Sequence, residues 1–147
     1  MMYLLLLLFC TTAQAQIQVA KAGDDWHVKI DSALTVIRTY DLEKYELLQR
    51  YCKRIDYWTG TFATTENKHN ILIPASEIRL GIVNDLAAIL VHESLHLYYL
   101  NNNIRMSVYE EESKCYLYEL DFLYCIPNVE PWLLTHALTQ AVIFSRK

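Results

Sequence analysis

Apolar residues surround the whole helical wheel of residues 84–100, a pattern typical of a helix buried at the centre of a domain. Apart from Asp85 at its start, the ionisable side chains of this segment are His92, Glu93 and His96. Asparagine tolerates the left-handed conformation at a helix C-terminus, and the run of asparagines at 101–103 is expected to end the helix. The pattern therefore predicts a central helix that carries three chemically active polar groups.

The first half of the chain is expected to contain two shorter helices. Residues 26–30 are predicted to form a short extended piece, and Asp31 is predicted to be the N-cap of a helix with apolar Leu34 and Ile37 on one face. Asp41 is predicted to cap a second helix. Its apolar positions recur every three or four residues and are Leu42, Tyr45, Leu48, Cys52 and Ile55. Its opposite face is expected to be solvated and carries Glu43, Lys44, Glu46 and Arg50.

Two more helices are predicted after the central one. Residues 107–110 read Ser-Val-Tyr-Glu, which has the form of a capping box and opens a helix that runs to about Leu123. Pro127 and Pro131 bracket a turn, and an amphipathic helix is predicted from there to Phe144.

The extended segments of the chain lie just before the central helix. Residues 59–65 and 71–73 are apolar runs separated by a polar stretch at 66–70, which predicts a β-hairpin. Pro74 lacks a backbone N–H, so the second run is expected to be an edge strand. We therefore predict an α+β fold, mostly helical, with a small hairpin or sheet beside the buried helix, and a single domain over residues 16–147.

The N-terminus has the form of an export signal. Residues 3–9 are an apolar run, too short to span a membrane, and Ala13-Gln14-Ala15 matches a small-residue cleavage site. Residues 1–15 are thus predicted to be a signal peptide, with a mature start near Gln16 and a secreted or periplasmic location. Three cysteines then remain, and their sequence contains no CxxC pair. They can form one disulfide and a free thiol, or three buried thiols.

Composition excludes two classes of protein. Hydrophobic residues make up 53% of the 147 positions and charged residues 20%, which is incompatible with an intrinsically disordered chain. The formal net charge is −4. Because the chain has no excess of Lys and Arg to displace counterions, we expect no binding to a nucleic-acid backbone.

The sequence His92-Glu93-Ser94-Leu95-His96 is an HExxH motif. Residues i and i+4 of a helix lie about 40° apart, so both imidazoles leave one face and can converge on one metal ion. Glu93 lies about 100° from His92, where it can accept a proton from a water beside that ion. A chance motif would usually fall on a solvated face. In an apolar helix, burial of these groups without a partner would cost several kcal/mol, and a bound cation removes that penalty.

Through residues 91–97 the chain resembles the zincin metallopeptidases. It lacks the Gly and third His of the metzincin branch, since Tyr99 and Asn102 stand in their places. The resemblance is to the gluzincins, and it covers about residues 60–125. It implies a zinc ion, one per chain, whose third ligand is a Glu on the following helix. Glu110, Glu111, Glu112 and Glu119 are the candidates there.

A helical wheel over residues 108–123 separates these four carboxylates. Glu112 coincides with the mean direction of the apolar side chains and Glu119 lies near it, whereas Glu110 is expected to be occupied in the capping box and Glu111 points to one side. Glu112 is therefore the predicted third ligand, with Glu111 and Glu119 as alternatives. The pattern departs from the gluzincin E-x-x-A at Cys115. The acidic run can also serve only to complement the N-terminus of the helix.

The resemblance implies hydrolysis of peptide bonds in a peptide or protein substrate, with Glu93 as general base and His92, His96 and Glu112 as zinc ligands. It also implies that an edge strand binds the substrate backbone, for which residues 71–73 are the candidate. Two other functions stay open: a non-catalytic, zinc-stabilised secreted binding domain, and a helical interaction module with a fortuitous motif. No particular oxyanion stabiliser is favoured among His136, Tyr98, Tyr99, Tyr109 and Tyr116.

Overall fold

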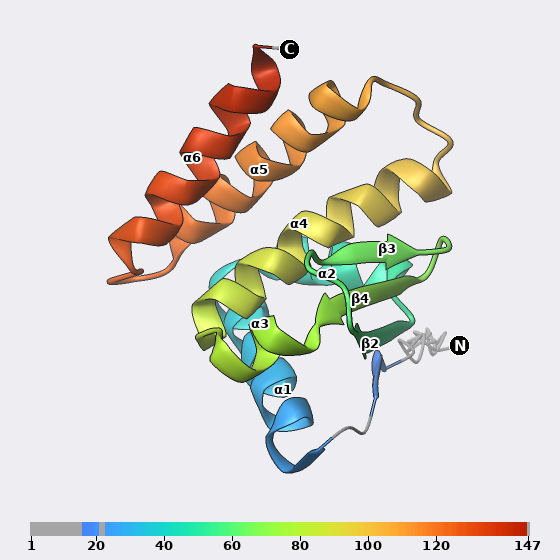
Figure 1. Ribbon diagram of the computed structural model, residues 1–147, viewed down its shortest axis with the longest axis vertical. Coiled ribbons are helices and arrows are strands. Elements are labelled where there is room, and N and C mark those ends of the chain that lie inside the picture. Colours follow the sequence, from blue (N-terminus) through green and yellow to red (C-terminus); the bar gives the residue numbers. More distant parts are fainter. Residues whose placement is uncertain (1–15, 21–22, 147) are drawn as a thin grey trace, which may run out of the picture.

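The structure is a computed structural model that describes residues 16–20 and 23–146 (Figure 1). The predicted signal peptide lies outside the described residues. Six helices and a four-stranded sheet make up the described chain, which confirms the predicted α+β class. The helices are α1 Gly23–Tyr40, α2 Leu42–Tyr51, α3 Ala75–Leu80, α4 Val83–Asn101, α5 Val108–Cys125 and α6 Pro131–Ser145. The strands are β1 Gln18–Val19, β2 Arg54–Trp58, β3 Thr64–Glu66 and β4 Asn70–Pro74.

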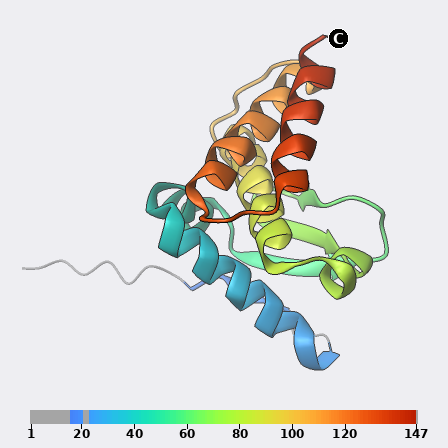
Figure 2. The same cartoon turned by 90° about the vertical axis from the view of Figure 1, so that its left-hand side faces the viewer.

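Helix α4 is the central element, as its apolar wheel predicts. It packs against α1 and α2 on one side and against α5 on another, and it also contacts β3. Figures 1 and 2 show that α5 and α6 form an antiparallel pair that lies across α4, away from the sheet. Because α4 has neighbours on several sides, apolar residues all around it are buried rather than exposed.

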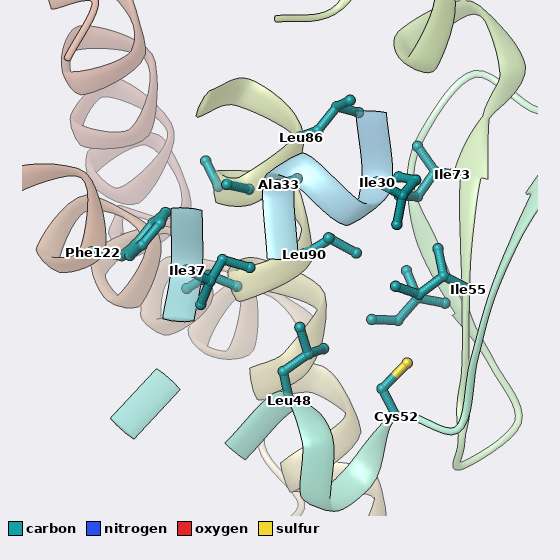
Figure 3. Packing of buried hydrophobic residues seen from close by; sticks show 14 of the residues in the cluster. Ile30, Ala33, Ile37, Leu48, Cys52, Ile55, Ile73, Leu86, Leu90 and Phe122 are labelled. Atoms are coloured by element: carbon teal, nitrogen blue, oxygen red, sulfur yellow. The ribbon is translucent and has the colours of Figure 1, made fainter. Parts of the chain in front are cut away.

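The main core lies where α4 meets α1, α2 and the sheet (Figure 3). Leu86 and Leu90 of α4 are fully buried there, together with side chains from the other elements. Those partners include Ile30, Ala33, Ile37, Leu48, Cys52, Ile55, Ile73 and Phe122. The core therefore fixes α4, and with it the HExxH motif, against α1, α2 and the sheet, and Phe122 of α5 joins it.

The prediction for residues 26–31 is wrong. Helix α1 begins at Gly23, so residues 26–30 are helical and Asp31 is not an N-cap. Trp26, Ile30 and Ala33 are buried at intervals of three and four residues, in phase with Ile37. Burial of this continuous apolar stripe against α4 outweighs the extended preference of the β-branched residues in the segment.

The second predicted helix is right at its start and wrong at its end. The Asp41 side chain accepts a hydrogen bond from the backbone N–H of Lys44, as an N-cap does. The helix ends at Tyr51, however, and Ile55 lies in β2 instead of extending the apolar face.

The face predicted to be solvated contains one buried side chain. Lys44 is only 6% exposed, and its ammonium group forms ion pairs with Asp41 at 2.9 Å and with Asp121 of α5 at 2.7 Å. It also lies 4.5 Å from the centre of the Tyr118 ring. Lys44 was predicted to be exposed because a helical wheel of α2 alone does not show that Asp121 of α5 lies beside it.

A hairpin forms as predicted, because β3 pairs antiparallel with β4. Its first strand is shorter than predicted, since residues 59–63 are not in a strand and β3 covers only residues 64–66. Its turn contains Asn67 with a positive φ of 56°, and the Asn67 side chain accepts a hydrogen bond from the N–H of His69. The edge position predicted for residues 71–73 is wrong. The strand order is β1-β2-β4-β3, and β4 also pairs with β2 in parallel. Pro74 is tolerated because it is the last residue of β4, where the chain leaves the sheet for α3.

Helices α5 and α6 form as predicted. Ser107 is the N-cap of α5, and its side chain accepts a hydrogen bond from the N–H of Glu110. The Glu110 carboxylate, however, pairs with Lys114 at 2.8 Å. Before α5, the chain leaves α4 through Asn103, whose φ is 53°.

The described cysteines are all free thiols: Cys52 and Cys115 are buried, and Cys125 is exposed. Within the described residues, no helix is long and apolar enough to cross a membrane.

Replacement of Lys44 by Met should destabilise the fold by about 1–3 kcal/mol, because it leaves the Asp41 carboxylate without its partner and removes a link between α2 and α5. The cost should stay below that of a fully buried pair, since the Asp121 side chain is 74% exposed. Urea denaturation followed by circular dichroism measures the change. Glu43→Gln, one residue away on the exposed face, is the control and should change stability by less than about 0.5 kcal/mol. Equal stabilities of the two variants would show that the buried ion pair contributes nothing.

Candidate metal centre

The HExxH motif lies in the second half of α4, on the side of the helix that faces α5. His92 and Glu93 are 7% and 5% exposed, and the His96 side chain is 13% exposed. As the i, i+4 spacing predicts, both imidazoles leave the same face, and their Nε2 atoms are 3.2 Å apart. The two rings thus direct corresponding nitrogen atoms at one point.

Glu112 of α5 lies against both of these nitrogen atoms. One carboxylate oxygen is 3.4 Å from Nε2 of His92, and the other is 3.5 Å from Nε2 of His96. The wheel over residues 108–123 indicated this orientation. The structure therefore brings together His92, His96 and Glu112, the three residues predicted to be ligands.

Two further glutamates of α5 hold the opposite nitrogen atoms of the imidazoles. Glu119 lies 3.1 Å from Nδ1 of His92, and Glu111 lies 2.7 Å from Nδ1 of His96. An ionised carboxylate only accepts hydrogen bonds, so these contacts favour the tautomer in which Nδ1 carries the proton. Each Nε2 is then the nitrogen with a free lone pair. This carboxylate–imidazole arrangement is the one that orients histidines that bind metal ions.

The role of Glu111 was not visible from the sequence. On the wheel it points to one side of α5, and only the position of α4 shows that this side faces His96. Glu119, by contrast, was expected near Glu112, and its contact with Nδ1 agrees with that position. The signal that could have identified both is the spacing Glu111, Glu112 and Glu119, which places three carboxylates within one third of the helical wheel.

With both Nδ1 atoms protonated, the groups that face one another between α4 and α5 can only accept hydrogen bonds or bind a cation. They are two Nε2 lone pairs and a carboxylate, separated by 3.2–3.5 Å. A tetrahedral ion with ligand bonds of about 2.0–2.2 Å holds its donor atoms roughly 3.3–3.6 Å apart. The donor set and its spacing therefore fit a metal ion.

The local charge also favours a cation. Glu93, Glu111, Glu112 and Glu119 supply four carboxyl groups around two imidazoles. Burial opposes the charged form of His92, but hydrogen bonds with Glu112 and Glu119 outweigh it and raise the His92 pKa to about 9. In the metal-free protein a proton thus supplies the positive charge that the site requires.

The carboxyl groups of Glu93 and Glu112 have opposite pKa shifts. Burial raises the pKa of Glu93, and the neighbouring charges of His92 and His96 only partly offset it. Burial also opposes ionisation of Glu112, but the hydrogen bond with His92 and the charge of His96 lower its pKa. Glu112 is therefore the carboxyl group that ionises more readily, and Glu93 is the stronger base of the two.

Cys115 is a donor that the sequence analysis did not consider. Its sulfur atom and one ring nitrogen each of His92 and His96 all lie within 4.8 Å of one another, and the residue is fully buried. Burial and the surrounding carboxylates raise the pKa of the Cys115 thiol. The group His92, His96 and Cys115 can hold a metal ion. Its position three residues after Glu112 on the same helix was the available signal.

One aromatic residue covers the site. Tyr116 packs edge-on against the His92 ring, with ring centroids 4.4 Å apart, and burial raises its pKa to about 12. Its ring centroid is 6.0 Å from that of His136 on α6. Tyr116, one of the tyrosines considered as oxyanion stabilisers, thus contacts a histidine of the motif.

The remaining histidines do not join the cluster. His27 is exposed on α1, and His69 lies in the hairpin turn, where its ring contacts the backbone carbonyl of Tyr51. The strand at residues 71–73, expected to bind substrate, lies inside the sheet and has no free edge. The free edge beside α4 belongs to β3.

No protein-family model, curated protein or solved structure was found to match this chain. The resemblance to gluzincins therefore stays a prediction from the motif residues.

Proposed function

We propose that this protein is an exported zinc-dependent peptidase that binds one zinc ion through His92, His96 and Glu112. One observation carries the proposal: two imidazole lone pairs and a carboxylate face one another at 3.2–3.5 Å, and both opposite ring nitrogens are held by glutamates. Such a set is stable when a cation lies at its centre. Nitrogen and oxygen donors in a roughly tetrahedral arrangement are typical of zinc.

When bound at such a site, zinc supplies a Lewis acid and lowers the pKa of a water toward about 7. Glu93 is the proposed general base. It follows His92 directly on α4, and burial raises the pKa of its carboxyl group, which makes it a stronger base. A site that served only to stabilise the fold would have no use for this carboxylate. The intact Glu93 thus favours hydrolysis over a purely structural zinc site.

An extended peptide is the proposed substrate. β3 contacts α4, and one side of β3 has no partner strand among the described residues. An unpaired strand offers its backbone N–H and C=O groups to a peptide in extended conformation. Residues 64–66 therefore take the role that the sequence analysis assigned to residues 71–73.

Glu93→Gln separates catalysis from metal binding. If Glu93 is the base and not a ligand, the variant should keep about one zinc per chain and lose peptide hydrolysis by a factor of roughly 10² to 10⁴. Zinc content by elemental analysis and cleavage of a peptide library, measured on the same preparation, check both parts. Loss of zinc in this variant would make Glu93 a ligand and contradict the proposed mechanism.

Glu112→Ala should lose most of the bound zinc, because it removes the only carboxylate among the proposed ligands of the ion. Glu110→Ala is the matched control on the same helix. Its carboxylate is exposed and pairs with Lys114, so the variant should keep zinc and lose only a few tenths of a kcal/mol of stability. Equilibrium dialysis against zinc compares the two. Retention of zinc by Glu112→Ala would show that Glu112 is not a required ligand.

Glu119→Gln should weaken zinc binding by about 10- to 100-fold without abolishing it. The amide still reaches Nδ1 of His92, but it no longer favours the tautomer that leaves Nε2 free. A competition titration with a chelator of known affinity measures the change. An unchanged affinity would mean that the contact between Glu119 and His92 does not orient the ligand.

A further inference from the structure

The thiol of Cys115 has different surroundings from those of the other described cysteines. Cys52 belongs to the hydrophobic core, and its sulfur atom lies 3.4 Å from the backbone oxygen of Arg54. Cys125 is exposed, and its sulfur atom lies 3.5 Å from the backbone oxygen of Asp121. Cys115 is fully buried outside that core, and in the described part of the chain its thiol forms no hydrogen bond. It instead lies within 4.8 Å of His92 and His96 ligand atoms.

A buried cysteine usually behaves as a small apolar residue packed among others. Cys52 fits that description. Cys115 does not, because its sulfur atom lies within 4.8 Å of a ring nitrogen of each motif histidine. It also shares a face of α5 with Glu112, which is three residues earlier. The sulfur atom is therefore placed among the donors of the metal site.

We propose that Cys115 is a fourth protein ligand of the metal ion, so that in its resting state the ion is held by His92, His96, Glu112 and Cys115. This inference rests on the proposed metal site and adds to it. On binding, the thiol loses its proton to solvent and a sulfur–metal bond forms, with no change in oxidation state. A set of two nitrogens, one oxygen and one sulfur is a closed tetrahedral site, and it favours zinc, cobalt and cadmium over magnesium and calcium.

This arrangement has a consequence for activity. A catalytic zinc site keeps one position open for water or substrate, whereas four protein ligands leave none. The resting enzyme would thus be latent until substrate or a conformational change displaces the thiolate. Removal of the thiol should raise the rate of hydrolysis, although this alone does not test coordination.

Cobalt(II) replaces zinc in such sites and gives a direct readout of a thiolate ligand. The purified, metal-free protein is titrated with Co²⁺ alone, and absorption is recorded in the near ultraviolet and the visible. The visible bands report a four-coordinate ion, and the near-ultraviolet band reports charge transfer from a thiolate. Wild type should show both sets of bands at one equivalent of Co²⁺.

The variant Cys115→Ala should lose the near-ultraviolet band and keep visible bands. Cys125→Ala, a matched change of an exposed thiol on the same helix, should keep both. Cys115→Ser, which preserves the volume of the side chain, replaces Cys115→Ala if circular dichroism shows that the latter is unfolded.

Visible bands without a thiolate band in wild type, or a thiolate band that survives Cys115→Ala, would overturn the inference and leave the metal site intact. The wild-type spectrum decides the matter even if neither variant folds. Absence of any Co²⁺ bands would overturn the metal site itself, and with it both the proposed function and this inference.

Discussion

The contact between imidazoles of α4 and carboxylates of α5 is the interaction on which the site depends. A helix that is apolar on most sides can bury His92 and Glu93 only if other groups compensate for the lost hydration. α5 provides this compensation through Glu111, Glu112 and Glu119, which contact both histidines. The carboxylates fix the imidazole tautomers, and the remaining lone pairs then require a proton or a cation at the centre.

The rest of the fold keeps these two helices in register. The core of α1, α2 and the sheet immobilises α4 from one side (Figure 3). α5 is held by α6 and by the ion pair of Lys44 with Asp121, which links it to α2. The Ser113 hydroxyl also donates a hydrogen bond to the backbone carbonyl of Ala141 in α6. The carboxylates of α5 thus lie on an element anchored at several points, as preorganised ligands require.

Apart from the first turns of α1, features encoded within one helix could be predicted from the sequence, whereas most features created by contacts between elements could not. The apolar wheel of α4 and the caps at Asp41 and Ser107 depend on local spacing, and they agree with the structure. Burial of Lys44 and the contact of Glu111 with His96 depend on a partner far along the chain. The same is true of β4. Its central position follows from its pairing with β2. β2 was not predicted, because Ile55 continues the helical spacing of the apolar residues before it. The order of acidic residues on α5 limited the choice of ligand, but only the packing of α4 against α5 shows what each carboxylate contacts.

The central claim is that the two motif histidines hold a metal ion, and native mass spectrometry tests it most directly. The purified protein is incubated with a slight excess of Zn²⁺, desalted and weighed under non-denaturing conditions, beside His92→Ala, His96→Ala and the exposed-site control His27→Ala. The account predicts one zinc per chain in wild type and in His27→Ala, and none in the other two variants. Wild-type protein without zinc, or full retention of zinc by His92→Ala and His96→Ala, would contradict it.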